Sequence, residues 1–420
     1  MDQILRTLLE EWRERKLPQV INRDISFGFL SDSRVNNAMV VTGFRRVGKT
    51  YILFQEIEKL LKIYSKEDVI YINFEDERII NPKTDLLSKL IPEIQSLFGK
   101  KPKYLFLDEL QIIPNWSKWV RRILDTEDIK LVITGSSSKM GSSELPTELR
   151  GRSWEVKVEP LSFKEFLGFK NIRLDYKNTE FNYYFNEYLK FGGLPAVVLS
   201  PEEKKNELLQ SYFQTVVQKE IIDRQNIRNE NVLKILLKLL LNSSYITISK
   251  LFNNMKSVGL PVGKTTIDKY ISYIEDSYFL NQVRIFSPKV VNQLFYPRKI
   301  YFIDNGLLNA LSTKFSKNYG RSFENLVYQK LRKSNEDIYY WKDQSDREVD
   351  FVILENGKVT ALYQACFDIS DEETLKRETK SLLRAKEILK CDNLNLISLE
   401  KPTNYEPSKI KLITANEFFI

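Results

Sequence analysis

The sequence contains no histidine in its 420 residues and has only two cysteines, Cys366 and Cys391. Without an imidazole group, the chain cannot form a Ser-His-Asp or Cys-His catalytic site, a histidine zinc site or a histidine pH sensor. Two cysteines cannot form a disulfide framework or a structural zinc site. Any chemistry must therefore use carboxylates, lysine, arginine, hydroxyl groups and Mg²⁺.

Long apolar runs are also missing, and the N-terminus has no apolar signal core. We therefore expect a cytoplasmic protein with no membrane partner. The 64 Lys and Arg residues exceed the 56 Asp and Glu residues, which gives a net charge of +8. This mild basic excess is compatible with a nucleic-acid partner but does not demonstrate one. The length predicts about three domains.

The most informative motif is Gly-Phe-Arg-Arg-Val-Gly-Lys-Thr at residues 43–50, a complete Walker A phosphate loop. An apolar run precedes it and an amphipathic stretch follows, which is the strand–loop–helix setting that the motif requires. Lys49 is expected to reach the β- and γ-phosphates of ATP, and the Thr50 hydroxyl to bind Mg²⁺. The residues expected to bind ATP are Gly43, Arg45, Arg46, Val47, Gly48, Lys49, Thr50 and Tyr51.

A similar sequence at residues 259–265 is not expected to bind phosphate. Only three residues separate its glycines, Pro261 lacks an N–H group, and no buried strand precedes it. We interpret this sequence as a turn between two helices.

An apolar strand predicted at residues 103–107 ends in Asp108 and Glu109, which is the Walker B pattern. Asp108 is expected to hold Mg²⁺ through water, and Glu109 to activate the attacking water as a general base. Another strand, predicted at 69–74, lies between the two Walker strands in the sequence. This order fits NTPases with an inserted strand and a catalytic glutamate beside the Walker B aspartate.

Candidate sensor and arginine residues follow these motifs. The strand predicted at 129–134 ends in hydroxyl residues, and Thr134 or Ser136 could sense the γ-phosphate, although a turn of small residues would give the same pattern. Arg150 or Arg152 could act as an arginine finger on the ATP of a neighbouring molecule in a homo-oligomer. Two arginines that simply face the solvent would explain this part of the sequence equally well.

In this order, the motifs resemble the AAA+ superfamily, and more narrowly the prokaryotic AAA+ ATPases with a C-terminal domain of unknown function. The resemblance continues through Pro-Leu-Ser-Phe-Lys-Glu-Phe-Leu at 160–167, Phe-Gly-Gly-Leu-Pro at 191–195, Tyr-Phe-Ile-Asp-Asn-Gly-Leu at 301–307 and Arg-Ser-Phe-Glu-Asn-Leu at 321–326. It therefore spans nearly the whole chain. It implies an α/β fold with a parallel sheet, ATP binding and ATP hydrolysis, but no known substrate.

We expect four domains: an AAA+ P-loop ATPase core at 1–165, a helical lid at 166–228, a winged helix at 229–315 and a nuclease-like α/β domain at 316–420.

In the winged helix, Thr247 is a predicted helix cap, and Thr265 is predicted to cap the next helix. That next helix could enter the major groove of DNA. The candidate phosphate contacts are Lys264, Lys269, Arg284, Lys289, Arg298 and Lys299. Intramolecular or protein contacts explain the same pattern equally well.

The C-terminal region resembles the restriction-endonuclease-like fold, because a helix bearing Glu324 precedes a strand bearing Asp350 and a second strand. Such nucleases hold Mg²⁺ with Asp and Glu and place a lysine two residues after the Glu. Here those positions are Gln364 and Cys366, so we expect an inactive domain. Glu348 lies on the same face of its strand as Asp350 and could supply another acid.

The leading hypothesis is an AAA+ ATPase coupled to DNA binding or remodelling. The alternatives are a switch-type NTPase that signals through a protein partner and a metal-dependent nuclease regulated by the ATPase.

Overall fold

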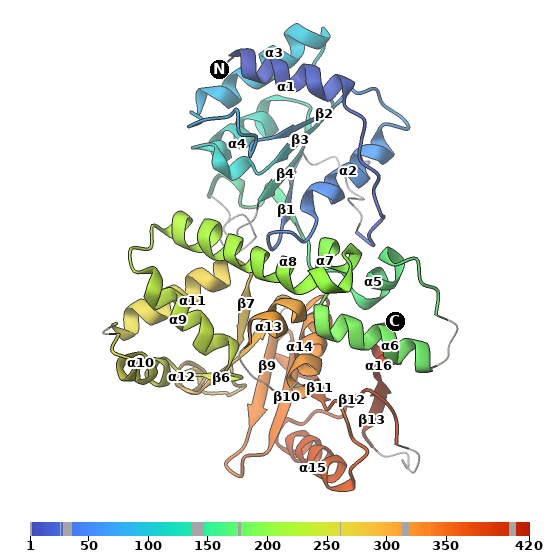
Figure 1. The fold of residues 1–420 in the computed structure, drawn as a ribbon, viewed down its shortest axis with the longest axis vertical. Coiled ribbons are helices and arrows are strands. Elements are labelled where there is room, and N and C mark those ends of the chain that lie inside the picture. Colours follow the sequence, from blue (N-terminus) through green and yellow to red (C-terminus); the bar gives the residue numbers. More distant parts are fainter. Residues whose placement is uncertain are drawn as a thin grey trace. The chain divides into compact units, whose positions relative to one another are not determined.

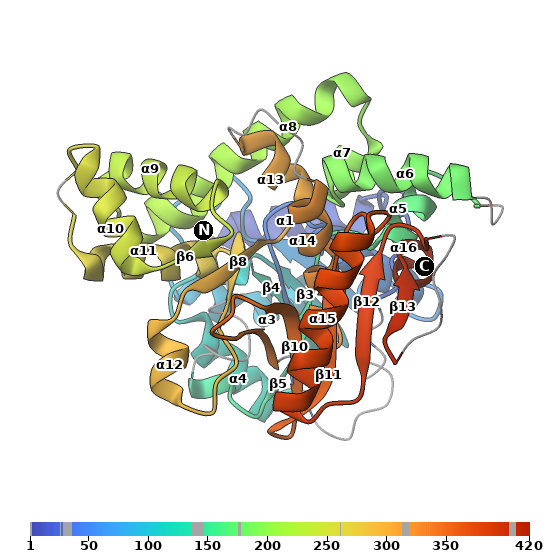
Figure 2. The ribbon, with the colours of Figure 1, turned by 90° about the horizontal axis from the view of Figure 1, so that it is seen from below.

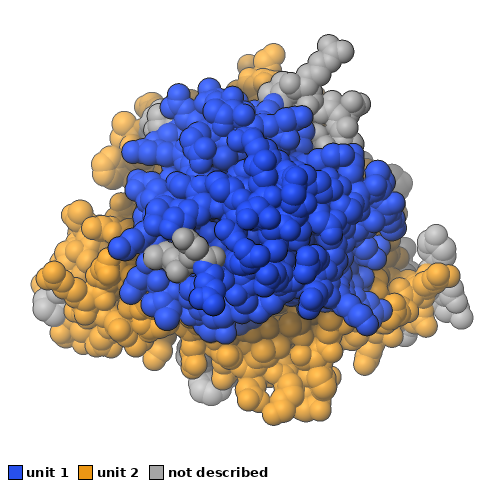
Figure 3. Space-filling view, turned by 90° about the horizontal axis from the view of Figure 1, so that it is seen from above, with its two compact units in different colours: residues 1–159, 276–278 blue, residues 160–275, 279–420 orange. Residues whose placement is uncertain are grey.

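A computed structural model describes residues 2–25, 27, 36–135, 147–174, 178–260, 262–312, 319–335, 337–402 and 409–420. The chain divides into two units (Figure 3). Residues 1–159 with 276–278 form unit 1, and residues 160–275 with 279–420 form unit 2. Unit 1 ends at residue 159, whereas the prediction ends the ATPase core at residue 165. The predicted lid, winged helix and C-terminal domain fall almost entirely within unit 2.

Unit 1 is built on a parallel five-stranded sheet with the order β2–β3–β4–β1–β5 (Figure 1). Four of its strands are almost completely buried, as their continuous apolar sequences predict. In the sheet, β4 separates the Walker A strand β1 from the Walker B strand β3, whereas β2 lies at the edge. The strands are β1 (Ala38–Thr42), β2 (Val69–Asn73), β3 (Tyr104–Asp108), β4 (Lys130–Gly135) and β5 (Ser153–Lys157).

The helices of unit 1 are α1 (Asp2–Glu14), α2 (Lys49–Leu60), α3 (Asp85–Phe98) and α4 (Trp116–Thr126). Helix α1 packs against α3 and the edge strand β2. The indole of Trp12 in α1 donates a hydrogen bond to the Val69 carbonyl at 2.9 Å, which fixes this helix to the sheet.

Unit 2 contains two sheets. The antiparallel sheet has the order β6–β8–β7, with β6 (Tyr245–Ile246), β7 (Leu280–Val283) and β8 (Arg298–Phe302). The five-stranded mixed sheet has the order β13–β12–β11–β10–β9. Its strands are β9 (Asp337–Lys342), β10 (Glu348–Glu355), β11 (Lys358–Ala365), β12 (Leu394–Ser398) and β13 (Lys411–Thr414).

The helices of unit 2 begin with α5 (Phe163–Phe169), α6 (Asn178–Phe191), α7 (Pro195–Leu199) and α8 (Glu202–Thr215). They continue with α9 (Glu230–Leu241), α10 (Ile248–Ser257), α11 (Lys264–Asp276), α12 (Val290–Phe295) and α13 (Asn305–Leu311). The last are α14 (Tyr319–Arg332), α15 (Glu372–Leu389) and α16 (Ala415–Phe419). Among the described residues, none of these helices has the length and apolar character needed to cross a membrane.

The glycine-rich sequence at 259–265 begins after α10, and its last two residues, Lys264 and Thr265, already belong to α11; Pro261 lies outside the described residues. The predicted cap at Thr247 is confirmed, because its hydroxyl accepts the Lys250 N–H at 3.1 Å. The predicted cap at Thr265 is wrong, because α11 already begins at Lys264.

The two sheets of unit 2 are joined by backbone hydrogen bonds beyond the end of β7. The N–H of Phe286 donates to the Tyr340 carbonyl at 2.6 Å, and the N–H of Tyr340 donates to the Arg284 carbonyl at 3.0 Å. The hairpin of the predicted winged helix therefore pairs with β9, the edge strand of the C-terminal sheet.

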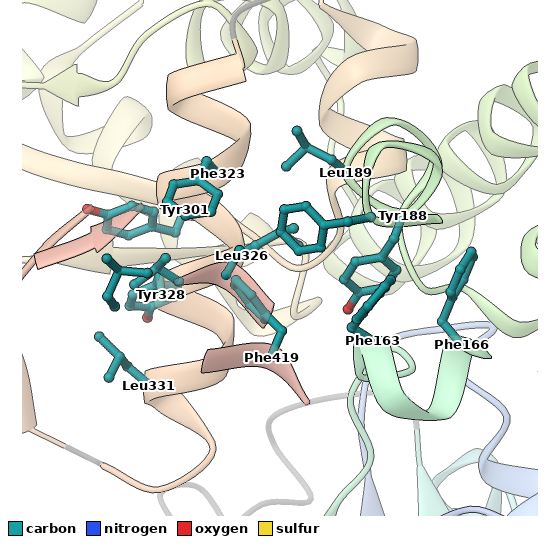
Figure 4. Close-up of a cluster of buried hydrophobic side chains, with 14 of the residues drawn as sticks. Phe163, Phe166, Tyr188, Leu189, Tyr301, Phe323, Leu326, Tyr328, Leu331 and Phe419 are labelled. Atoms are coloured by element: carbon teal, nitrogen blue, oxygen red, sulfur yellow. The ribbon is translucent and has the colours of Figure 1, made fainter. Parts of the chain in front are cut away.

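One aromatic core connects the three predicted domains of unit 2 (Figure 4). It includes Phe163 of α5, Tyr188 of α6, Tyr301 of β8, Phe323 of α14 and Phe419 of α16. Helix α15 packs across β10, β11 and β12 (Figure 2). Because one core draws on all three regions, their packing energies are not independent.

The family-like sequences 191–195 and 301–307 meet at Asp304, which caps α13. Its carboxylate accepts the N–H of Gly193 at 2.7 Å and the N–H of Leu307 at 3.2 Å. Gly192 has a φ of 73°, and a Cβ there would lie 2.2 Å from an Asp304 oxygen, so only glycine fits. Burial raises the pKa of Asp304 to about 6, although the backbone N–H groups oppose this change.

Candidate functional site

The Walker A residues form the turn from β1 into α2. Gly43 has a φ of 144°, and a Cβ there would lie 2.2 Å from the Val158 carbonyl oxygen. Gly48 has a φ of 95° and directly precedes α2, whose first residue is Lys49. The glycines therefore allow the loop to fold closely, and the positive end of the α2 dipole faces the loop, as anion binding requires.

The Lys49 side chain is buried within this loop, with only 6% of the residue exposed. Its ammonium donates to the carbonyls of Gly43 at 3.1 Å and Phe44 at 3.3 Å. It also lies 4.0 Å from a Glu109 carboxylate oxygen. The general-base candidate and the phosphate-binding lysine are thus brought together by the sheet.

Asp108 is the most highly connected acid of the site. Its buried carboxylate accepts hydrogen bonds from the hydroxyls of Thr50 at 2.7 Å, Tyr71 at 3.0 Å and Thr134. Burial and the nearby Asp108 raise the pKa of Tyr71, so its phenol remains protonated and donates. The sequence analysis did not identify Tyr71. Its only signal in the sequence is the hydroxyl group that it adds to an otherwise apolar strand.

Glu109 is held by a turn with a left-handed φ of 55°. Its backbone N–H donates to the Thr134 hydroxyl at 2.9 Å, and its carboxylate accepts a hydrogen bond from the Gln111 side chain. Thr134 therefore contacts both Walker B acids. Gln111 is a second residue that the sequence pattern did not identify.

The oxygens present fit the Mg²⁺ ion that a Walker site uses. Thr50 Oγ1 and Asp108 Oδ2 lie 2.7 Å apart and combine a hydroxyl with a carboxylate, which are ligands that Mg²⁺ prefers. These two residues would hold the ion.

The remaining loop residues have polar partners within unit 1. Arg45 forms an ion pair with Glu75 at 2.6 Å, and the Val47 carbonyl accepts from the guanidinium of Arg23 at 3.1 Å. Arg46 has a φ of 74°. Tyr51 is 54% exposed in the first turn of α2, so its ring is accessible to a ligand.

The predicted arginine fingers lie after β4. Arg152 pairs with Asp125 of α4, and Arg150 is exposed. Neither observation assigns a catalytic role. Ser136, the other sensor candidate, lies outside the described residues.

A second charged cluster lies in unit 2, around Lys299 of β8. Its ammonium is 2.9 Å from Glu324, 2.6 Å from Glu348 and 2.7 Å from Asp350. Only 3% of Lys299 is exposed. The prediction that this lysine contacts DNA phosphates is therefore wrong, because its charge is buried and fully engaged by carboxylates.

Burial lowers the pKa of Lys299, but Asp350 and the neighbouring acids together raise it well above its usual value. Burial raises the pKa of Asp350 to about 7, while the positive charge of Lys299 opposes this rise. The expectation that Glu348 and Asp350 face the same way is confirmed by their shared partner.

Gln364 and Cys366 occupy the positions where the sequence resemblance would place a glutamate and a lysine. The Gln364 amide donates to Glu378 at 2.7 Å, and its oxygen accepts the Asp350 N–H at 3.2 Å. Burial raises the pKa of the Cys366 thiol to about 11, so this group is uncharged at neutral pH.

The parallel sheet, the loop before α2 and the acidic pair after β3 define an AAA-type P-loop ATPase domain. A family model described as "AAA domain" matches residues 35–167. The chain belongs to the same family as the uncharacterized protein MJ1544 of Methanocaldococcus jannaschii. The two sequences are 38% identical over 422 residues, which cover 98% of this chain and 90% of that protein.

Other similarities extend beyond the ATPase domain. Models described as domains of unknown function, DUF8612 and DUF4143, match residues 182–318 and 319–410. An uncharacterized protein of Haemophilus influenzae is 29% identical over 353 residues, covering 83% of this chain and 86% of that protein. The Walker-type ATPase PABY2304 of Pyrococcus abyssi aligns with 74% of this chain and 95% of its own, with 14% identity and a TM-score of 0.46.

Proposed function

We propose that this protein hydrolyses ATP with Mg²⁺, using Asp108 and Thr50 to hold the ion and Glu109 as the general base. The observation that carries the proposal is the convergence of three hydroxyls on Asp108, with Glu109 beside Lys49. This arrangement joins both Walker motifs in one site. The ligand-binding set is Gly43, Arg45, Arg46, Val47, Gly48, Lys49, Thr50 and Tyr51.

Each side chain has a defined task in this proposal. Lys49 and the loop N–H groups bind the phosphates, and Glu109 accepts the proton of the attacking water. Mg²⁺, when bound, neutralises charge on the β- and γ-phosphates. Thr134 fixes the backbone of Glu109 and the carboxylate of Asp108, so it positions the base relative to the ion ligands.

The test is ATP turnover by the purified chain with and without Mg²⁺. Turnover that requires Mg²⁺ and is lost in Glu109→Gln supports the proposal. Unchanged turnover in Glu109→Gln would show that another group acts as the base.

We further propose that hydrolysis is coupled to DNA through residues 229–315. The element order of this region is α9, β6, α10, α11, β7, α12, β8, and its helices followed by two paired strands support the winged-helix proposal. The isoleucines Ile267, Ile271 and Ile274 of α11 are buried, whereas Lys264 and Lys269 are exposed. Stimulation of turnover by DNA supports this coupling; an unchanged rate, together with slow turnover, favours the switch-type NTPase.

Arg150 or Arg152 would act on a second copy of the chain in a homo-oligomer. Mixing an Arg152→Ala chain with a Lys49→Ala chain should then restore some hydrolysis, because each supplies the group that the other lacks. A turnover number that is independent of protein concentration, with no restoration on mixing, would indicate a monomeric enzyme.

A further inference from the structure

The Lys299 cluster combines residues from three elements that are distant in the sequence. Lys299 comes from β8, the middle strand of its sheet, while Glu324 comes from α14 and both Glu348 and Asp350 come from β10. The rings of Tyr245 and Tyr340 lie 5.5 Å and 5.9 Å from the ammonium. The lysine is therefore enclosed by acids and aromatic faces.

Alternation along β10 places Asp350 on the same face as Glu348, and an irregularity after Asp350 adds Phe351 to that side of the strand. The pairing of β10 with β9 shifts register between Val349 and Val352, which both pack in the core on the α15 side. Between them, Phe351 enters the aromatic core with α14, and Asp350 contacts Lys299. Bulges commonly re-aim a side chain in this way.

The ammonium occupies the position that a divalent cation would need. Carboxylate oxygens bind Mg²⁺ or Ca²⁺ at roughly 2.0–2.6 Å, and an ammonium hydrogen bonds to them at roughly 2.7–2.9 Å. An ammonium at 2.6–2.9 Å from three different carboxylates therefore lies among the same oxygens that the ion would use. The two cations exclude each other by volume and by charge.

We propose that Lys299 is the resident cation of this carboxylate site. It takes the place of a divalent metal ion in a nuclease-like site. Its ion pairs hold β8 against α14 and the C-terminal sheet, and we call this set of contacts the lock. The polar groups around the site agree with this role. Tyr301, two residues after Lys299, donates to Glu324 at 2.7 Å.

The lock has a second attachment point at the next residue of α14. Asn325 follows Glu324 in this helix, and its side chain accepts the Phe302 N–H at 2.7 Å and donates to the Phe302 carbonyl at 3.0 Å. Strand β8 is thus held to α14 at both Lys299 and Phe302.

The test uses Mn²⁺ as the probe, with binding followed by electron paramagnetic resonance and by thermal melting. The full-length chain carries Asp108→Asn in all samples, so that the ATPase site loses its carboxylate ligand. We expect no saturable Mn²⁺ binding to this chain. Adding Lys299→Met should lower the melting temperature and create saturable Mn²⁺ binding, and Mn²⁺ should raise the melting temperature of this variant again.

Two matched variants control for general effects. Lys289→Met removes an exposed lysine from the same hairpin and should neither bind Mn²⁺ nor melt earlier. Adding Asp350→Asn to Lys299→Met should remove the Mn²⁺ effect. A folded Lys299→Met chain that does not bind Mn²⁺ would overturn the proposal.

If Lys299→Met does not fold, the test compares two other chains, both carrying Asp108→Asn: one keeps Lys299 and the other has Lys299→Arg. Both retain a cation, so neither should bind Mn²⁺ in the Asp108→Asn chain. Saturable binding that disappears on Asp350→Asn would show that a metal ion shares the site with the lysine, contrary to the proposal.

Discussion

The hydroxyl of Thr50 donates a hydrogen bond to Asp108 at 2.7 Å and so joins the end of the Walker A loop to the end of the Walker B strand. The two oxygens that are expected to hold Mg²⁺ are adjacent because β1 and β3 end at the same edge of the parallel sheet. Asp108 is the last residue of β3 and Thr50 lies in the first turn of α2, so both ligands belong to regular elements rather than to the loop itself.

Binding and hydrolysis should separate in two variants. Lys49→Ala should abolish tight ATP binding, because the ammonium contacts phosphate in the ground state. Glu109→Gln should retain binding and lower kcat by about 10²–10⁴-fold, because this carboxylate acts on water in the transition state. Nucleotide binding by calorimetry and phosphate release measure the two effects. Lys59→Ala, at an exposed position of the same helix, should change neither.

Thr134→Val should reduce kcat more than Tyr71→Phe does. The valine removes the hydrogen bond to Asp108 and the acceptor for the Glu109 N–H, whereas the phenylalanine removes only one donor to Asp108. The loss of the buried hydroxyl should also cost about 2 kcal/mol in the free energy of unfolding of unit 1. Steady-state kinetics and denaturant unfolding provide the two measurements. A larger kinetic defect in Tyr71→Phe would argue against Thr134 as the positioning group.

If residues 229–315 bind DNA as proposed, charge reversal in this region should weaken the binding and reduce its dependence on salt. Changing Lys264, Lys269 and Lys289 to glutamate removes exposed cations, and the slope of log affinity against log salt should fall by about one for each phosphate that the protein no longer neutralises. Fluorescence anisotropy at several salt concentrations measures this slope. If the unaltered chain does not bind DNA at low salt, the better hypothesis is a switch-type NTPase that signals through a protein partner.

The stability of unit 2 should depend on the protonation of Asp304. Because the folded-state pKa is raised to about 6 from 3.8, this group contributes stability that is complete below pH 3.8 and is lost as the pH rises through 6. Relative to Asp304→Asn, the free energy of unfolding should fall by about 2 kcal/mol between pH 4 and pH 7. Denaturant unfolding across this range measures the difference. A difference that grows with pH would mean that the N–H groups around the carboxylate outweigh its burial.

The ATPase unit could be predicted from the sequence because its signals are local. The phosphate loop requires specific residues at fixed spacing, and the apolar strands are evident from their composition. Tyr71 was missed because its role depends on β2 and β3 becoming neighbours. Gln111 lies only two residues after Glu109, but it is not part of the Walker B pattern. Lys299 was misjudged for the same reason: next to Arg298 it resembles part of a basic surface, and only the fold brings Glu324 and Asp350 around it.

The hydrogen bonds between residues 284–286 and Tyr340 also affect where the chain can be divided for expression. A fragment of residues 316–420 would keep the pairing of β9 with β10 but would lack the backbone partners of Tyr340 at residues 284–286 and the lysine that compensates three acids. Its exposed strand edge would favour association with other copies and aggregation. A fragment that begins at residue 160 keeps both the strand partner and the lysine, and is therefore the better candidate for producing the C-terminal half in soluble form.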